Sequence, residues 1–436
     1  MIYIGIDIGK EENIIRFFNE KEEEIRKKCA LKNNYQGHCK FKEIIDILIY
    51  DMRLKSYDDV CIGIESTGHY WINLYHILQK FGIKNIYMVQ GYTVKKMREL
   101  ITKNRGKNDS IDSMSIAFCL KGGYYSDIHR KGEGINALKR MTRLRNELNE
   151  DLTAIKNKIH AWLDVYNQFY LSIFNGRLTV TGILLLENYP APADSLKISL
   201  REFINSLVDK NHLVDRKKLT LYREEVETWE FYHMEVDASI RHELKCYIET
   251  YRAIEKTINE LEKDIDRISK EIYGELYISL CAEKGMSKFN FSSLLAEIGD
   301  CREFKTARSL LAYAGLGILT KCSSGKKKGE GELTKSGNRK IRKYLYVLTR
   351  QLILSNPEIK KLYCYYLSYE RDKENRKIEM WVATMCKILR CIYGSIKNGT
   401  KFDTNEMFKN IDFSKCNMEK FNKLYLKGNI VKILEA

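Results

Sequence analysis

The sequence predicts an α/β domain at the N-terminus, followed by a long helical arm and a mostly helical C-terminal domain. Short apolar runs alternate with amphipathic segments over about the first 130 residues. Apolar residues then recur at three- and four-residue steps across 136–162 and 240–272. Only three prolines occur in 436 residues, so most of the chain can form long helices.

The N-terminal elements are expected in the order of three strands, a helix, a strand, a helix, a strand and a helix. The expected strands are 2–8, 14–19, 24–31, 60–65 and 83–90. The expected helices are 35–53, 71–81 and 110–120. This order is typical of a ribonuclease-H-like domain, although unrelated folds also begin with a strand in an α/β order.

The helical part of the chain begins with a predicted coiled coil. Residues 240–272 carry apolar side chains at heptad spacing over more than four heptads, with charged residues between them. This segment is expected to pair with 136–162 as an antiparallel hairpin, within the chain or between protomers. Residues 166–235 are expected to form an irregular insert. The predicted regions are an α/β domain, an arm with its insert, a helical domain and a basic tail, at 1–132, 133–274, 275–400 and 401–436.

The charge balance favours a polyanionic partner. Lysine and arginine outnumber aspartate and glutamate by 74 to 58, which gives a net charge of +16. Neutralising phosphates releases condensed counterions and so favours nucleic-acid binding. The alternative is a solvated basic surface that only keeps the protein soluble.

Cysteines and the N-terminal segment exclude several other classes of protein. None of the twelve cysteines forms a C-x-x-C pair, which argues against a zinc site or a disulfide framework. The start, MIYIGIDIGK, lacks the basic segment and cleavage site of a signal peptide. No apolar run approaches the ~20 residues that span a bilayer. We therefore expect a cytoplasmic protein without membrane contact.

Four acidic residues are placed where a carboxylate needs an explanation. Asp7 lies in the middle of an apolar strand, where burying a carboxylate is costly without a cation or strong donors. Glu65 ends the fourth strand, in IGIESTG. Asp109 and Asp112 lie three residues apart in KNDSIDS, so both project from one face at the start of a helix.

In a ribonuclease-H-like sheet these four carboxylates can converge, because the first and fourth strands are neighbours and the last helix crosses their ends. Hard oxygen ligands of this kind suit Mg²⁺, with Mn²⁺ as a substitute, and two such ions can activate a nucleophile and stabilise a leaving oxygen. In the alternative interpretation Asp109 caps the helix, Asp112 complements its dipole, and Asp7 belongs to the phosphate turn of an actin-like kinase. That interpretation leaves Glu65 unexplained, and no second Asp-Gly phosphate turn is suitably placed.

GIDIGK, IESTG and KNDSIDS, in this order and spacing, resemble the DEDD motif of the insertion-sequence 110/1111 transposases. The stretches LLAEIGDCREFKTARSLLAYAGLG and SSGKKKGEGELTKSGNRKIRKYL are similar to the second domain of that family. The resemblance covers nearly the whole chain, including the coiled coil and the YPAP turn.

The resemblance implies an N-terminal RuvC-like domain, a coiled-coil arm and a C-terminal transposase domain with a catalytic serine. It also implies a homo-oligomer, from dimer to tetramer, that acts on two double-stranded DNA partners, donor and target. A structured noncoding guide RNA encoded by the element would pair with both.

The family's serine precedes a glycine upstream of a basic T-K-x-G-N stretch, which places it at Ser324. The double glycine common after that serine is Gly325–Lys326 here, so Ser323 is the alternative nucleophile. A serine hydroxyl is a weak nucleophile and needs activation. The nearby lysines can stabilise the transition state, but they cannot deprotonate the hydroxyl. Without the resemblance, a flexible loop is the preferred interpretation of this segment. The expected nucleic-acid contacts are Lys326, Lys327, Lys328, Lys335, Asn338, Arg339, Lys340, Arg342 and Lys343.

The resemblance therefore implies a recombinase that uses a serine–phosphate intermediate and a DEDD-bound Mg²⁺ site, guided by RNA. A RuvC-type, structure-selective endonuclease with water as its nucleophile is the alternative. A non-catalytic nucleic-acid binder is disfavoured, because clustered acids repel phosphate.

Overall fold

The computed structural model describes residues 1–65, 68–101, 109–128, 133–208, 214–232, 234–319, 322–323, 326–327, 332–333, 336–368 and 376–404, with 408, 411 and 413. The chain divides into two compact units, residues 1–130 and 131–436. Among the described helices, none has the length and apolarity that crossing a bilayer requires. The ten cysteines whose side chains the structure describes are free thiols.

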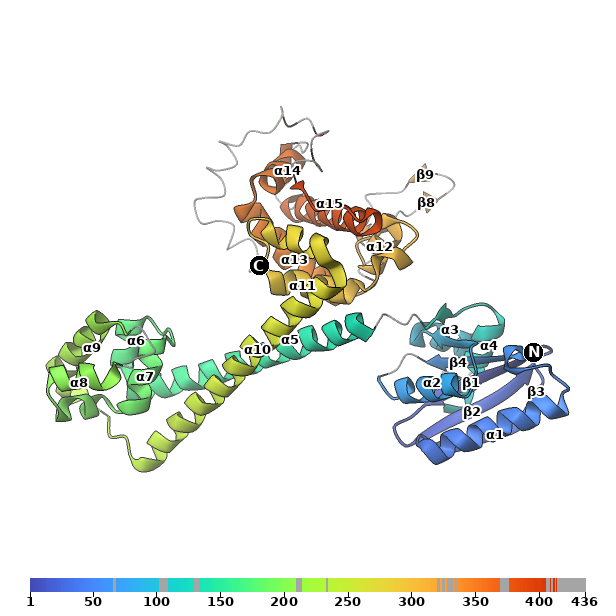
Figure 1. The fold of residues 1–436 in the computed structure, drawn as a ribbon, viewed down its shortest axis with the longest axis horizontal. Coiled ribbons are helices and arrows are strands. Elements are labelled where there is room, and N and C mark those ends of the chain that lie inside the picture. The colour runs from blue at the N-terminus through green and yellow to red at the C-terminus, as the bar shows by residue number, and fades with distance from the viewer. Residues whose placement is uncertain are drawn as a thin grey trace. The chain divides into compact units, whose positions relative to one another are not determined.

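A mixed six-stranded sheet forms the centre of the first unit (Figure 1), with the strand order β3-β2-β1-β4-β5-β6. The strands are β1 (Ile2–Ile8), β2 (Glu12–Asn19), β3 (Glu24–Lys32), β4 (Val60–Glu65), β5 (Ile86–Val89) and β6 (Ser126–Asp127). β1 runs antiparallel to β2 and parallel to β4, and β4 runs parallel to β5. This sheet, with helices between its strands, fits a ribonuclease-H-like domain.

Helices cover both faces of this sheet. The helices are α1 (Tyr35–Asp51), α2 (Trp71–Lys80), α3 (Gly91–Ile101) and α4 (Asp109–Lys121), with a short 3₁₀ turn at Tyr57–Asp59. The even-numbered isoleucines of β1 pack with residues of α1 and α2, such as Phe41 and Leu74. On the opposite face, Val94 of α3 and Ile116 of α4 pack against β5. The strand period of two therefore separates the two cores.

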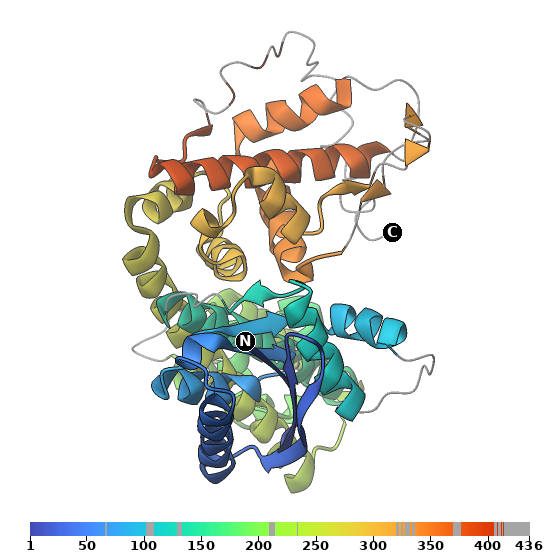
Figure 2. The same ribbon diagram turned by 90° about the vertical axis from the view of Figure 1, so that its right-hand side faces the viewer.

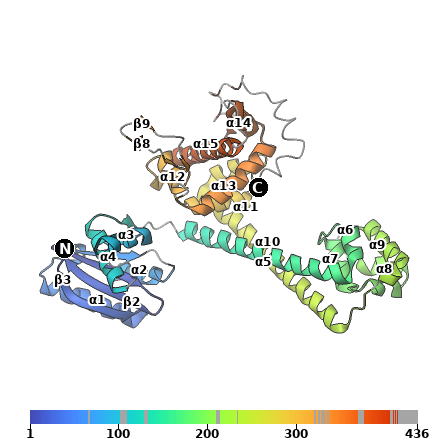
Figure 3. The same ribbon diagram turned by 180° about the vertical axis from the view of Figure 1, so that it is seen from behind.

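Two long helices of the second unit, α5 (Glu133–Tyr166) and α10 (Ala238–Ala282), lie side by side (Figures 1 and 3). Their contacts run in opposite directions along the sequence: Leu138 packs with Ile265, and the Trp162 indole donates to the Ile240 carbonyl. Between these contacts, Arg145 pairs with Glu262 at 2.6 Å. The two helices are therefore antiparallel.

The segment 166–235, expected to be irregular, is instead largely helical. It contains α6 (Gln168–Phe174), α7 (Val180–Asn188), α8 (Leu200–Leu207) and α9 (Arg216–Thr228), with 3₁₀ turns at Pro192–Lys197 and Glu230–Tyr232. The side chains of Asn167, Thr179, Ser199 and Asp215 each cap one of these helices. Helices of two or three turns with a cap residue between them show little periodicity, which is why the pattern was not recognisable.

The C-terminal part of the second unit is a helical bundle. Its helices are α11 (Lys288–Ile298), α12 (Ala307–Tyr313), α13 (Arg339–Ser355), α14 (Pro357–Ser368) and α15 (Arg376–Asn398), with a 3₁₀ turn at Cys301–Glu303. α14 and α15 lie side by side, in orange and red in Figure 2. Most of the predicted basic tail lies outside the described residues. Phe402 and Phe408 are buried in this bundle, so the first part of that tail belongs to the core.

Short strands join α12 to α13. β7 (Ile318–Leu319) pairs with β10 (Glu332–Leu333), and β8 (Cys322–Ser323) pairs with β9 (Lys326–Lys327). At the end of the segment that joins α12 to α13, Gly337 packs closely against the C-terminal end of α12. A Cβ on Gly337 would lie 2.4 Å from the Tyr313 carbonyl oxygen, so only glycine allows this approach.

Candidate metal centre

Two glycines let α4 lie directly on the sheet. Gly5 and Gly63 face each other across β1 and β4. A Cβ on Gly5 would lie 1.9 Å from the Ser113 carbonyl oxygen of α4, and a Cβ on Gly63 would lie 2.8 Å from Ile116. Asp7 and Glu65 follow these glycines by two residues along their strands, so both project toward the face that α4 covers.

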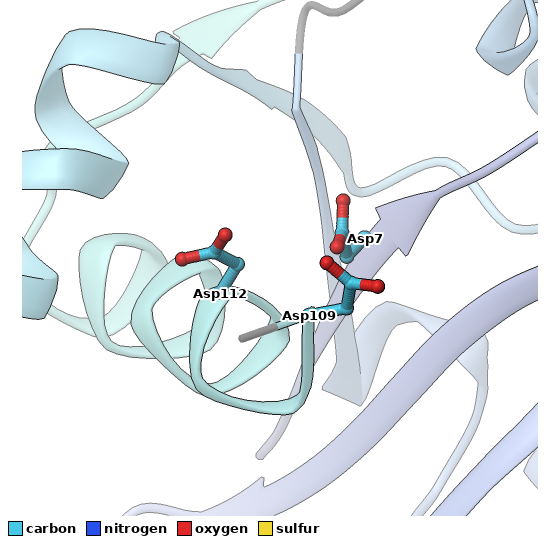
Figure 4. Close-up of side chains that lie close together, drawn as sticks. All are labelled: Asp7, Asp109 and Asp112. Carbon is cyan, nitrogen blue, oxygen red and sulfur yellow. The ribbon is translucent and has the colours of Figure 1, made fainter. Parts of the chain in front are cut away.

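Three of the four predicted carboxylates meet where α4 begins. Asp7, Asp109 and Asp112 each offer an oxygen, and these three atoms lie within 4.8 Å of one another. Figure 4 shows Asp109 and Asp112 on successive turns at the start of α4 and Asp7 on the neighbouring strand. Asp112 is buried, Asp7 is half-buried and Asp109 is exposed, so the cluster is open to solvent on one side.

Glu65 lies outside this group of atoms, although its backbone is next to Asp7. Ile6 pairs with Ile64 in the parallel ladder, so Asp7 and Glu65 are the next residues in register, on adjacent strands roughly 4.8 Å apart. The side chain of Glu65 extends to the start of α3, where a Cβ on Gly91 would lie 2.7 Å from its Oε1. The structure therefore places the backbones of Asp7 and Glu65 side by side, with the Glu65 carboxylate at the start of α3.

Asp112 also forms an ion pair that the sequence analysis did not predict. Nη1 of Arg98, on α3, lies 2.6 Å from Oδ1 and 3.0 Å from Oδ2 of Asp112. The two side chains are 14% and 5% exposed, so the pair is largely shielded from water. Arg98 lies on a helix missed at the sequence level, although Val94, Met97 and Ile101 follow helical spacing after a strand.

The donor set fits a divalent cation. Carboxylate oxygens are the hard ligands that Mg²⁺ and Mn²⁺ prefer. Oxygens bound to one Mg²⁺ lie at most ~4.2 Å apart, twice the ~2.1 Å ligand distance, so the three acids are close to a shared-ion geometry. The exposed side at Asp109 leaves room for waters and phosphate oxygens, which Mg²⁺ retains in enzyme sites.

The predicted serine and basic residues belong to the second unit. Ser323 ends β8 and pairs with Lys326 of β9, whereas Ser324, Lys328 and Lys335 lie outside the described residues. Arg339, Lys340 and Lys343 are exposed on the first turns of α13. The guanidinium of Arg342 donates to the Ala314 carbonyl at 2.9 Å and so ties α13 to the end of α12.

Two family models match this chain in separate places. A DEDD transposase model of the IS110 family matches residues 4–168. A second model, described as a transposase of the IS116/IS110/IS902 family, matches residues 279–364. The two matches occur in the order that the motifs predicted.

The chain belongs to the IS110 family of DEDD transposases. A comparison with curated proteins found no match. Family membership implies that the transposase binds DNA and acts in DNA transposition, as an enzyme that cleaves and rejoins strands. DEDD domains generally use a divalent metal, in agreement with the cluster of Asp7, Asp109 and Asp112.

A second buried carboxylate of the transposase lies in the helical unit, at the end of α11. Glu297 is fully buried and accepts hydrogen bonds from Arg143 at 2.7 and 3.1 Å. Lys139 lies 3.3 Å away, and the Asn338 amide donates at 3.0 Å. Burial raises the pKa of Glu297, but the hydrogen bonds from Arg143 and Asn338 and the charges of Lys139 and Arg143 outweigh it and lower the pKa to about 2.

Asn338, predicted as a nucleic-acid contact, has structural hydrogen bonds. Its Oδ1 accepts from the Lys340 and Ile341 amides and so caps α13. Its backbone amide donates to the Tyr313 carbonyl at 2.8 Å, and its side-chain amide donates to Glu297. Asn338 therefore joins the starts and ends of three helices. Its sequence signal is an asparagine directly before a run of helix formers, which is typical of a cap.

Proposed function

We propose that this transposase cleaves and rejoins DNA by phosphoryl transfer, with Ser324 as nucleophile and Mg²⁺ held by Asp7, Glu65, Asp109 and Asp112. The observation that carries this proposal is the meeting of three of these acids within 4.8 Å. Carboxylates that approach so closely repel one another unless a cation compensates them. A surface that only binds nucleic acid gains nothing from such a cluster, because it repels phosphate.

The four acids would have different roles in this site. Asp112 is buried and Asp7 lies in a central strand, so both would form the rigid part of the ligand set. Asp109 is exposed and would face the substrate side, and Glu65 would turn from Gly91 to complete the set. Mg²⁺ bound there would neutralise phosphate oxygens and stabilise the leaving oxygen.

In the proposed cleavage step the Oγ of Ser324 attacks the scissile phosphorus. The Oγ–P bond forms as the bond from phosphorus to the leaving sugar oxygen breaks, and the serine proton is passed on to that oxygen. Lys326, Lys327 and Lys328 would supply positive charge to the phosphate, which favours the transition state. Rejoining reverses these steps with the sugar hydroxyl of another strand as the attacking group. Ser323 is the alternative nucleophile.

The proposed partners are donor and target DNA duplexes and a structured noncoding guide RNA. The net charge of +16 and the exposed Arg339, Lys340 and Lys343 of α13 support binding to phosphates, together with Lys335. We also propose that α5 and α10 form an antiparallel coiled coil, a geometry that Leu138, Trp162 and Ile265 support. The chain would assemble as a dimer or tetramer, in part through α5 and α10. Light scattering can measure the mass of this assembly.

Trapping the intermediate tests the nucleophile. Purified transposase is incubated with donor DNA, target DNA, Mg²⁺ and RNA transcribed from the sequence flanking the gene. A covalent protein–DNA adduct is expected on a denaturing gel with the wild type and with Ser323→Ala, but not with Ser324→Ala. Omitting the RNA is expected to abolish the adduct.

Three outcomes contradict parts of the proposal. Loss of the adduct in Ser323→Ala alone would make Ser323 the nucleophile. Cleavage without any adduct would indicate that water attacks, as in a structure-selective endonuclease. Recombination that proceeds equally well without RNA would remove the guide from the mechanism.

A further inference from the structure

Arg98 faces the proposed metal site from a helix that carries none of its ligands. It lies on α3, which packs against α4. Its Nη1 contacts both oxygens of Asp112, at 2.6 and 3.0 Å. Because the pair is largely buried, this interaction is less screened than a surface ion pair.

With a metal ion bound, Asp112 would therefore lie between two positive charges. One is Arg98, and the other is the ion that Asp7, Asp109 and Asp112 would hold, since an oxygen of Asp112 lies within 4.8 Å of oxygens of the other two acids. A guanidinium and a divalent ion that approach the same carboxylate repel each other, and they compete for its lone pairs.

We propose that Arg98 is a positioning residue that acts as the built-in counter-ion of the metal-free site and sets its affinity for metal. It holds Asp112 in place while the acids are close together without an ion, and it lowers the affinity of the site by competing for the same carboxylate. This inference rests on the proposed metal site. Its consequence is a transposase whose centre is stable without metal and whose metal is exchangeable.

The test compares Arg98→Gln with Lys121→Gln in the full-length protein. Lys121 lies at the other end of α4, about 18 Å from Asp109 at 1.5 Å per residue, and pairs with Glu22 at the surface. Each substitution removes one positive charge from the first unit. Titration calorimetry with Mn²⁺ is expected to show about 10-fold tighter binding in Arg98→Gln, because a competing positive charge beside the ion is removed, and little change in Lys121→Gln.

Thermal unfolding provides the second readout. In EDTA, Arg98→Gln is expected to melt several degrees below the wild type, because Asp112 is left as a buried carboxylate without its arginine. Saturating Mn²⁺ is expected to close most of this gap, because the ion takes over the compensating charge and binding stabilises the folded state. Arg98→Lys keeps the charge and is expected to bind Mn²⁺ within about 3-fold of the wild type.

The outcomes separate this inference from the metal site itself. The proposed metal site is wrong if the wild type does not bind Mn²⁺, or if Asp112→Asn binds Mn²⁺ as the wild type does. If the wild type binds Mn²⁺ but Arg98→Gln binds it equally or more weakly, the metal site stands and the counter-ion role is wrong. Failure of Arg98→Gln to fold in Mn²⁺ as well as in EDTA would give Arg98 a purely structural role and also overturn the inference.

Discussion

Asp112 in the first unit and Glu297 in the second are both buried carboxylates paired with an arginine, yet their surroundings differ. Glu297 meets two cations, Arg143 and Lys139, and a side-chain amide. Asp112 meets Arg98 on one side and two further carboxylates on the other. Around Glu297 the charge is compensated within the helical bundle, which is typical of a structural ion pair. Around Asp112 like charges are gathered, which is typical of a functional site.

The largest expected effect is a loss of recombination activity when the acidic cluster of the first unit is changed. Asp7→Asn is expected to lower recombination by at least ~10³-fold, because stabilisation of transition-state charge by a metal is worth several kcal/mol. Its melting temperature in EDTA is expected to equal or exceed that of the wild type, since one of three neighbouring acids loses its charge. Plasmid recombination and circular dichroism measure the two effects.

Asp46→Asn is the control for that experiment. Asp46 is a carboxylate of the same unit that pairs with Lys42 on α1, away from the cluster. It is expected to retain recombination activity. Equal activity in Asp7→Asn and the wild type would show that Asp7 has no role in catalysis. The acidic cluster of the first unit would then not differ in function from the Glu297 ion pair of the second unit.

The next effect tests stability at the structural carboxylate. Glu297→Ala is expected to lower the free energy of unfolding by about 3 kcal/mol, because it leaves two cations without their buried partner. The value is at the low end of the usual range because the Arg143 side chain is 40% exposed and can regain water. Urea unfolding followed by tryptophan fluorescence reports on this, since three of the four tryptophans lie in the second unit.

Glu262→Ala provides the matched comparison, because its partner Arg145 lies on α5, as does the Glu297 partner Arg143. Glu262 pairs with Arg145 but is 37% exposed, so its loss is expected to cost under about 1 kcal/mol. Equal costs for Glu262→Ala and Glu297→Ala would show that burial does not distinguish the two ion pairs.

The pH dependence of stability sharpens the comparison further. The folded pKa of Glu297 is about 2, below its ordinary value of 4.5, so its contribution is fully present above pH 4.5 and is lost as the pH falls toward 2. At pH 3 the wild type is expected to have lost about 2 kcal/mol from this residue. Glu297→Gln cannot titrate and is expected to lack that part of the acid-induced loss. Identical acid profiles in the two proteins would contradict the lowered pKa.

The smallest expected effect is a change in the salt dependence of DNA binding when an exposed lysine of α13 is removed. Lys343 is exposed on α13, whereas Arg342 is tied to the Ala314 carbonyl. Lys343→Ala is expected to reduce the slope of log affinity against log salt by about 1 for double-stranded DNA. Lys245→Ala, on α10 beside Glu249, is expected to leave the slope unchanged. A fluorescence-anisotropy titration at several salt concentrations measures both, and equal slopes in all three proteins would exclude Lys343 as a phosphate contact.

Five of the six described strands and three of the four described α-helices of the first unit were predictable, because each carries its own periodic signal, whereas the two-residue strand β6 is too short to carry one. The predicted strand at 60–65 and the predicted helix at 110–120 correspond closely to β4 and α4. The helix α3 was missed because it is a short helix directly after a strand, and Arg98 was missed with it. The insert 166–235 was expected to be irregular because its helices are short and separately capped.

The sequence by itself determined the order of elements, the basic charge and the positions of four acids that required an explanation. Only the tertiary structure decided which of those acids meet, because contact depends on Gly5 and Gly63 allowing the α4 backbone onto the sheet. It also decided that Arg98 faces Asp112 and that Glu297 faces Arg143, partners 14 and 154 residues apart in the chain. Such pairs leave no periodic trace, since a side chain's partner is set by how helices pack and not by its neighbours in sequence.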